Sequence, residues 1–294
     1  MKSSLKISGG DNMPKTTLLF WIIISVYILL TPQSVFASDN QIEKKLQKIV
    51  EKMEAESKID DNLKPEKKST DSKVYPKKKE VIFPSRITVY KPLFRGSPVG
   101  RVAGGTRGIL DKYPSLLCVI TPDHTAFTIR DQPQFYWFLG RLTTYPIELT
   151  IIEDQAIYPV LEVRISSPEL PGIQRIRLAD YGIHLQQGLV YKWFIALLPD
   201  TNCRSKDILA WGAVKYIKIS DELNAKLSHL DKAITPNLYA AAGIWYDAFA
   251  EISDLIETST NNVKLKQRRD ALLEQIGLPE IAQNKIKTQI PGTN

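Results

Sequence analysis

The sequence predicts a mainly β protein, an antiparallel β-sandwich of the immunoglobulin or fibronectin type III kind followed by a short C-terminal helical tail. From Val81 to Ser220, short runs rich in Val, Ile, Tyr and Phe are separated by Pro, Gly and Asp at the roughly 8–12-residue spacing of a sandwich. Several of these runs alternate apolar and polar residues, and after Ser220 the apolar period becomes helical. A β-barrel is the alternative architecture for residues 81–220.

The alternation is clearest where Ile147, Leu149 and Ile151 are separated by Glu148 and Thr150. A strand of this pattern buries one face and leaves the other in water, as strands of antiparallel sheets do. The predicted strands are Ile87–Tyr90, Leu116–Thr121, Ala126–Arg130, Phe135–Leu139, Ile147–Glu153, Val160–Ile165, Ile173–Leu178, Val190–Leu197 and Ile208–Ile219.

One turn motif sharpens the sandwich prediction. Leu185, Gly188 and Tyr191 have the L-x-x-G-x-x-Y spacing of a tyrosine corner, in which the tyrosine hydroxyl bonds back across the turn. Trp137 lies in an early apolar strand and is a candidate for the core aromatic residue. The residues expected to have structural roles are Trp137, Tyr191, Trp193 and Trp245.

The helical tail is predicted over residues 221–288, with a disordered end at 289–294. Ser220 is placed to cap a first short helix, and Thr235-Pro236 gives an N-cap followed by proline at the first helical position. Apolar residues at a spacing of three and four then run to Ile256, which predicts one amphipathic helix. A last helix begins near Asn262 and ends at Gly277. Because a single α-hairpin cannot bury its own apolar face, we expect it to dock on the sandwich or on a partner.

Residues 1–37 have the three parts of a secretory signal peptide. Basic residues come first, the apolar run Leu18–Leu30 follows, and small residues precede a cleavage site that we place after Ala37. A membrane-spanning helix needs about 20 apolar residues. This run has 13, so a retained anchor is the alternative. Met13 is an alternative start that keeps the signal, and we expect a periplasmic or extracellular protein.

Residues 38–80 are rich in Lys and Glu, and we expect a charged, largely disordered tether. Ile42, Leu46, Ile49 and Met53 have a 4-3-4 spacing, but two heptads are fewer than the about three or four that a coiled coil needs. The lysines could contact anionic lipid or cell-wall polymer. Any membrane contact is therefore expected only from this tether or from the signal segment.

The basic charge of the chain is concentrated ahead of the region that is expected to fold. The net charge is +7, but residues 81–294 contain 24 Lys and Arg against 21 Asp and Glu. A nucleic-acid-binding domain carries a strongly basic folded surface. We therefore expect no nucleic-acid partner.

A glycine- and arginine-rich stretch after residue 94 is the first candidate ligand or partner loop. Successive glycine amides can form an anion-binding nest, and arginines can hold phosphate or carboxylate. The stretch lacks the G-K-[ST] ending of a P-loop, no helical pattern follows it, and a loop wrapping the sandwich is the alternative. The candidate residues are Arg95, Arg101, Gly104, Gly105 and Arg107.

Two further segments carry polar residues between strong apolar patterns. Arg204, Ser205 and Asp207 form a candidate binding loop at one end of the sandwich, although Asp207 closing a turn on Ser205 is the simpler interpretation. Tyr246 and Asp247 follow Trp245 in the helical tail. We favour hydrogen bonds that hold the helix on the sandwich over contacts with a partner.

No catalytic, metal or cofactor site is predicted. The three histidines are isolated and lack H-x-H or H-E-x-x-H spacing, and there is no G-x-S-x-G motif. Cys118 lies in an apolar run beside His124, where a buried and inert thiol is favoured over a nucleophile. Cys118 and Cys203 could also pair in an oxidising compartment, and the sequence leaves this open.

Several blocks of the sequence together carry a family resemblance. They are Gly100-Arg101-Val102-Ala103-Gly104-Gly105-Thr106-Arg107-Gly108, Pro133-x-Phe135-x-Trp137, Pro171-Gly172-Ile173, Leu185-x-x-Gly188-x-x-Tyr191-x-Trp193, Arg204-Ser205-x-Asp207 and Gly243-Ile244-Trp245-Tyr246-Asp247-Ala248. With these blocks the chain resembles a family of uncharacterised exported bacterial proteins, common in cyanobacteria, called domain of unknown function 928. The resemblance runs from about Pro98 to Ile281 and implies export and the same two-part layout, but no activity.

These observations favour an exported, non-catalytic binding or scaffolding module of the cell envelope, whose partner is an envelope protein or polymer. An envelope-polymer hydrolase with carboxylates distant in sequence is the first alternative. A structural protein tethered by an uncleaved apolar segment is the second.

Overall fold

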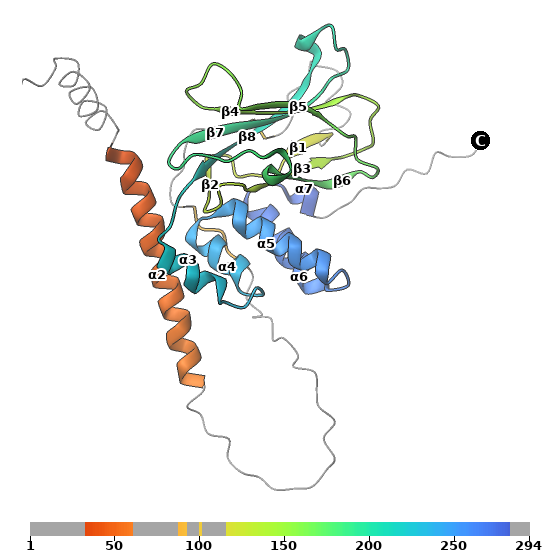
Figure 1. The fold of residues 1–294 in the computed structure, drawn as a ribbon. Coiled ribbons are helices and arrows are strands. Elements are labelled where there is room, and N and C mark those ends of the chain that lie inside the picture. The colour runs from red at the N-terminus through yellow and green to blue at the C-terminus, as the bar shows by residue number, and fades with distance from the viewer. Residues whose placement is uncertain (1–32, 61–87, 93–99, 102–115, 283–294) are drawn as a thin grey trace, which may run out of the picture.

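The structure is a computed structural model that describes residues 33–60, 88–92, 100–101 and 116–282. Within these residues it contains eight strands in two sheets, followed by C-terminal helices (Figure 1). The strands are β1 (Leu117–Val119), β2 (Ala126–Thr128), β3 (Gln134–Leu139), β4 (Ile147–Glu153), β5 (Leu161–Ile165), β6 (Gly172–Arg177), β7 (Val190–Leu197) and β8 (Ile208–Tyr216).

The strands form a three-stranded sheet, β1-β3-β6, and a five-stranded sheet, β2-β8-β7-β4-β5. All strand pairs are antiparallel except β2 and β8, which run parallel with Ala126 opposite Val214. The expectation of a purely antiparallel sheet is therefore wrong at this edge. A parallel pair needs a long crossover connection, and β3 to β7 lie between β2 and β8 in the chain.

Aromatic side chains from both sheets meet in one core. Phe135 of β3 stacks on Trp193 of β7, with ring centroids 4.6 Å apart and planes within 5°. The expected core residue Trp137 is also buried. Tyr191 accepts a hydrogen bond at its hydroxyl from the backbone N–H of Gln186 (3.2 Å), which is the bond that the L-x-x-G-x-x-Y motif predicts. The β-patterned sequence thus builds two layers over a shared apolar centre.

The first predicted strand, Ile87–Tyr90, is the exception among the strand predictions. Ile87 lies outside the described residues, and Thr88–Tyr90 are not in a strand. The backbone N–H of Tyr90 instead donates to the side chain of Gln275 (2.8 Å), and the Gln275 amide donates to the Thr88 carbonyl (2.7 Å). A side chain of the helical tail therefore bonds the backbone N–H and C=O groups that a neighbouring strand would have bonded in a sheet.

The described part of the tail, residues 221–282, contains five helices. They lie below the sheets in Figure 1. They are α3 (Asp221–Ser228), α4 (Thr235–Ala242), α5 (Trp245–Thr258), α6 (Val263–Gln275) and α7 (Pro279–Ala282). The long helix predicted from Pro236 to Ile256 is wrong, because the chain breaks between α4 and α5 at Gly243. This residue has φ = 86°, which favours glycine. α6 begins next to Asn262, as predicted, and the Asn262 side chain caps it, accepting from the Leu265 N–H at 3.2 Å.

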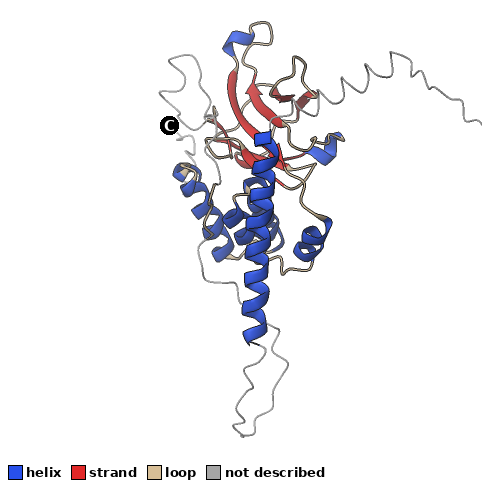
Figure 2. Ribbon diagram, turned by 90° about the vertical axis from the view of Figure 1, so that its left-hand side faces the viewer, coloured by secondary structure: helices blue, strands red, loops and turns tan. Residues whose placement is uncertain are grey.

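A helix also occupies part of the region expected to be a disordered tether. Residues 38–60 belong to α2 (Gln33–Asp60), so that expectation is wrong there, while residues 61–80 lie outside the described residues. Ile42, Leu46 and Val50 are fully buried on one stripe of α2. Figures 1 and 2 show α2 running along one side of the molecule, beside α3 and α4.

Polar contacts attach α2 to both parts of the fold. Asp39 forms a buried ion pair with Lys215 of β8 (2.9 Å), and Glu43 accepts a hydrogen bond from the Ser220 N–H (2.9 Å). The stripe of three apolar residues is too short for a coiled coil by itself, but α2 packs on α4 and α3. The predicted signal peptide before residue 33 lies outside the described residues. Among the described helices, none combines the length and the apolarity that crossing a bilayer requires.

Candidate functional site

The N-terminal turn of α5 is fixed to the sheets by three successive side chains. Trp245 donates from its indole to the Ile120 carbonyl at 3.2 Å. The buried Tyr246 hydroxyl accepts from the Trp193 indole (2.9 Å) and donates to the Ala213 carbonyl (3.1 Å). Thr121 Oγ1 lies 3.1 Å from the same hydroxyl. These bonds are the intramolecular docking that we favoured over contacts with a partner.

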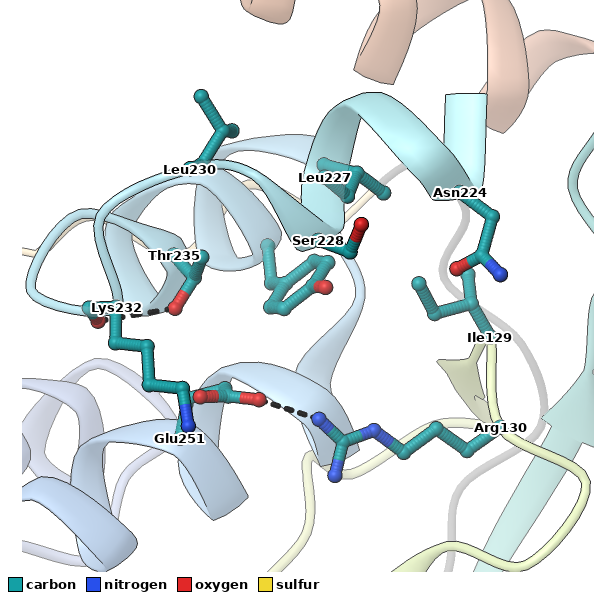
Figure 3. A pocket seen from close by; sticks show the side chains of 10 residues that line it. Ile129, Arg130, Asn224, Leu227, Ser228, Leu230, Lys232, Thr235 and Glu251 are labelled. Carbon is teal, nitrogen blue, oxygen red and sulfur yellow. Dashed lines mark hydrogen bonds and ion pairs between the residues drawn. The ribbon is translucent and has the colours of Figure 1, made fainter. Parts of the chain in front are cut away.

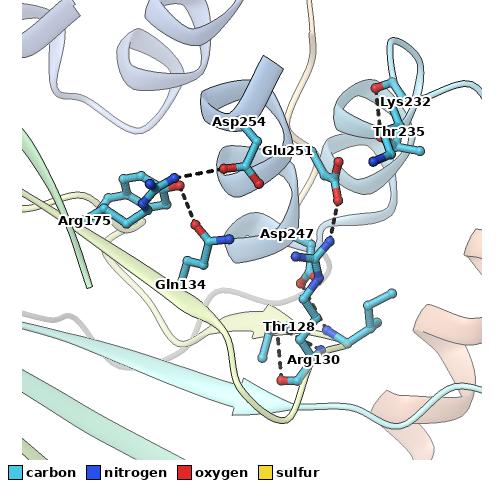
Figure 4. Close-up of polar contacts among 11 residues, drawn as sticks. Thr128, Arg130, Gln134, Arg175, Lys232, Thr235, Asp247, Glu251 and Asp254 are labelled. Atoms are coloured by element: carbon cyan, nitrogen blue, oxygen red, sulfur yellow. Dashed lines mark hydrogen bonds and ion pairs between the residues drawn. The ribbon is translucent and has the colours of Figure 1, made fainter. Parts of the chain in front are cut away.

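The third side chain, Asp247, holds Arg130, which follows β2. Asp247 Oδ2 accepts from the Ile129 N–H (3.1 Å), and Asp247 Oδ1 lies 3.2 Å from Arg130 Nε. One helical turn later, Glu251 pairs with Arg130 Nη2 (Figure 4). Asp247 has no exposed side-chain surface, whereas Glu251 is 17% and Arg130 38% exposed. Two carboxylates on one face of α5 thus fix a guanidinium that reaches solvent.

Burial and charge act in opposite directions on this cluster. Complete burial raises the pKa of the Asp247 carboxyl, and the Arg130 charge counteracts the rise. For Arg130, burial would lower the pKa, but Asp247 and Glu251 outweigh burial and raise it. The guanidinium therefore stays charged and keeps its orientation.

A cavity of about 220 Å³ lies beside this cluster, between α3, the start of α4 and α5. Figure 3 shows the guanidinium of Arg130 on one side of the cavity and the side chain of Lys232 reaching toward Glu251 on the other. Asn224 and Ser228, four residues apart on α3, lie on the same helix face and line the cavity. The remaining lining residues are Ile129, Leu227, Leu230, Thr235 and Tyr239. Polar and apolar side chains thus both line a space that can admit a small ligand.

One family model matches residues 102–286, the Domain of Unknown Function (DUF928). The chain belongs to this family. No curated protein and no solved structure matches it. The matched DUF928 region contains both sheets, the helical tail and all residues that line the cavity, whereas α2 lies outside it.

A second polar contact joins the DUF928 sheets to α5. Arg175 of β6 lies 3.0 Å from Asp254, on the next turn of the helix (Figure 4). The same guanidinium lies 3.0 Å from Glu257. Tyr136 lies beside this pair, and burial raises its pKa to about 12. The two arginines, Arg130 and Arg175, therefore clamp α5 from two sheet positions. Only Arg130 lines the cavity.

Among the candidate residues of the glycine-rich loop, Arg101 belongs to the described part of the chain. Arg95, Gly104, Gly105 and Arg107 lie outside the described residues. Arg101 donates through Nη1 to the carbonyls of Ile276 and Thr121. The carbonyl of its neighbour Gly100 accepts from the backbone N–H of Trp211 (2.9 Å). A Cβ at position 100 would collide with the Trp211 indole. Arg101 thus ties the end of α6 to the sheets.

The second predicted loop closes on itself and on β4. Arg204 makes a two-pronged contact with Glu148, with Nη1 3.1 Å from Oε2, and its Nε lies 2.8 Å from Asp207 Oδ2. Hydrogen bonds from Arg204 lower the pKa of Glu148. Ser205 Oγ lies 3.2 Å from Cys203 Sγ, so Asp207 closes the turn on Arg204, whereas the sequence suggested Ser205. The guanidinium is held by internal carboxylates.

The cysteines and the buried histidine show no nucleophilic arrangement. Both cysteines are free thiols, so the disulfide that the sequence left open is not formed. Cys118 is 2% exposed, and burial raises its pKa to about 12. His124 bonds Asp123 (3.1 Å) and Tyr90 (3.2 Å) through its two nitrogens. Across the described ranges, no group of three or more His, Cys, Asp and Glu residues could hold a metal ion.

The sequence did not identify the cavity residues Arg130, Glu251, Asn224 and Lys232. They come from the segment after β2, from α5, from α3 and from the α3–α4 loop, and Arg130 is 121 residues from Glu251. Two local signals were present: the i, i+4 pairs Asp247/Glu251 and Asn224/Ser228 place polar groups on one helix face. Neither pair indicates which distant residue it meets.

Proposed function

We propose that the protein is exported and acts as a non-catalytic binding module of the cell envelope, with the cavity beside Arg130 and Glu251 as its ligand site. One observation carries the proposal: the charged group at the cavity is preorganised. Arg130 is held by Glu251 and by the fully buried Asp247, so its guanidinium has a fixed orientation. A rigid charge beside hydroxyl and amide side chains is typical of a recognition site.

A hydrolase acting on an envelope polymer is the second candidate. Hydrolysis of a glycosidic bond uses two carboxyl groups about 5–10 Å apart that both reach the substrate. Asp247 and Glu251 are the carboxylates nearest the cavity, but Asp247 has no exposed side-chain surface and is turned toward Arg130 and the Ile129 N–H. Glu251 lines the cavity without a second carboxylate among the described lining residues. The geometry therefore favours binding over hydrolysis.

The location of the protein is part of the proposal. Residues 1–37 have the pattern of a signal peptide. Asp39 and Ile42, which attach α2 to the fold, follow the expected cleavage site, so cleavage after Ala37 keeps both contacts. If the apolar segment is retained, the same fold becomes a membrane-tethered structural protein. We propose an envelope protein or polymer as partner and no nucleic acid, because residues 81–294 are nearly neutral.

The scaffold is proposed to be an immunoglobulin- or fibronectin-III-like sandwich. The stacking of Phe135 on Trp193 across the two sheets and the hydroxyl bond of Tyr191 support this architecture. In this arrangement the helices cover one end of the sandwich, and the cavity lies where β2 meets them.

The test is retention of the purified protein on isolated bacterial envelopes. We expect the wild type to sediment with envelopes, and Asn224→Leu, which fills and desolvates the cavity wall, to remain in solution. Asn261→Leu is the matched control, because Asn261 is an exposed asparagine outside the cavity lining. Equal retention of wild type and Asn224→Leu would contradict the cavity assignment. N-terminal sequencing of the exported protein tests cleavage after Ala37.

A further inference from the structure

The charges around the cavity cancel. Arg130 and Lys232 contribute two positive groups, Glu251 lies on the wall, and Asp247 lies directly behind the guanidinium. An anionic ligand would meet the Glu251 carboxylate, and a cationic ligand would meet Arg130 and Lys232. A charged ligand of either sign would thus lose its hydration and also be repelled by a like charge in the wall.

The cavity is lined by both hydrogen-bond donors and hydrogen-bond acceptors. Arg130 and Lys232 can only donate, Glu251 can only accept, and the Asn224 amide does both. The hydroxyls of Ser228 and Thr235 donate to the Ala225 and Lys232 carbonyls and can accept from a ligand. The Tyr239 hydroxyl can donate or accept. A ligand that matches such a wall carries several groups that are themselves both donors and acceptors. Sugar hydroxyls have this property.

The size and the apolar part of the lining narrow the ligand further. A cavity of about 220 Å³ has room for a small ligand such as one sugar ring. Leu227, Leu230 and Ile129 supply the apolar part of the cavity lining, against which the C–H groups of a sugar ring can pack.

We infer that the cavity binds one uncharged sugar ring, the end unit of an envelope glycan, through Asn224, Lys232, Arg130 and Glu251. The inference rests on the proposed function, since it names the ligand class of the same site. Arg130 and Glu251 hold hydroxyls with a fixed donor and a fixed acceptor, and Asn224 closes the site from α3.

The test uses the full chain, purified as the host processes it, and sugars that differ in charge on a similar ring. The neutral probes are the methyl glycosides of glucose, galactose, mannose and N-acetylglucosamine; the charged probes are glucuronate, glucosamine at pH 6 and inorganic phosphate. Saturation-transfer NMR detects binding and titration calorimetry measures Kd. We expect at least one neutral glycoside to bind, at least about fivefold more tightly than its charged counterpart, which is the equivalent of about one hydrogen bond.

The variants separate this cavity from nonspecific sugar contacts. Asn224→Leu should weaken binding of the neutral glycoside at least about fivefold, whereas Asn261→Leu should leave Kd unchanged. Three results would each overturn the inference. The first is tighter binding of phosphate or glucuronate than of the neutral glycosides, and the second is an unchanged Kd in Asn224→Leu. The third is no binding of any neutral glycoside up to about 100 mM, since an interaction of about −4 kcal/mol already gives a Kd of about 1 mM. If envelope retention still depends on Asn224, the proposed function stands and only the ligand class is wrong.

Discussion

The Tyr246 hydroxyl is a buried polar contact that docks α5 on the sheets, and its removal tests the fold. Tyr246→Phe keeps the ring, which packs edge-on against Phe135 at 5.4 Å, and deletes only the oxygen. That oxygen accepts from the Trp193 indole at 2.9 Å and donates to the Ala213 carbonyl at 3.1 Å. Burial raises the pKa of Tyr246, so the hydroxyl keeps its proton for the second bond.

The magnitude follows from what the substitution leaves behind. The indole N–H of Trp193, whose side chain is fully buried, loses its acceptor, and an unsatisfied buried donor costs about 1–3 kcal/mol. Ala213 and Thr121 each lose one bond worth about 0.5–1.5 kcal/mol net. Because the Thr121 hydroxyl can rotate to another partner, we expect Tyr246→Phe to cost about 3 kcal/mol of unfolding free energy.

Urea unfolding followed by tryptophan fluorescence measures this loss, and the m-value should not change. A decrease of about 3 kcal/mol corresponds to a fall in Tm of about 6–12 °C for a domain of this size. Tyr158→Phe is the control, because Tyr158 is 81% exposed and should change stability by less than about 0.5 kcal/mol. A loss in Tyr246→Phe as small as that in Tyr158→Phe, less than about 0.5 kcal/mol of unfolding free energy, would refute the assignment of the hydroxyl as a docking contact.

Three further predictions concern other parts of the molecule. Because Arg204 lowers the pKa of Glu148, their pairing stabilises the fold above about pH 4.3 and is lost as the pH falls through the lowered pKa. In urea titrations, Arg204→Gln should therefore be less stable at pH 7, with a difference from wild type that shrinks below about pH 4. Thiol labelling of the native protein should modify Cys203 and leave the buried Cys118 unmodified until unfolding, and equal rates would contradict the described burial. Asp39→Ala, which removes the carboxylate from a buried lysine on β8, should cost about 3 kcal/mol in thermal or urea unfolding; unchanged stability would show that α2 does not dock.

The sheets could be predicted because their elements carry their own pattern. The strands Ile147–Glu153 and Val190–Leu197 were predicted with the bounds that the structure has, since each has apolar residues bounded by turn residues. The pairing could not be predicted in the same way. The parallel contact of β2 with β8 joins Ala126 to Val214, and alternation does not indicate which neighbour a strand takes.

The errors in the helical regions have a physical reason in common. In α2, the short apolar stripe gives too little stability for an isolated helix, and the partners that stabilise it, α4 and Lys215, follow more than a hundred residues later. In the tail, Gly243 was consistent with a helix interior in the sequence, but its φ of 86° allows α5 to turn onto the sheets. Tertiary contacts decided both outcomes.

The two carboxylates of α5 show why a site of this kind escapes sequence analysis. Asp247 and Glu251 have the same chemistry and lie one turn apart, yet Asp247 is fully buried and Glu251 lines the cavity. The difference arises because the helix is docked through Tyr246, which sets how deeply each residue of the first turns is buried. Asp247 therefore positions Arg130 from behind, while Glu251 and Arg130 together face the ligand space. The docking contacts and the ligand site are consequently one structural unit, and a displacement of α5 would alter the cavity even where no lining residue is changed.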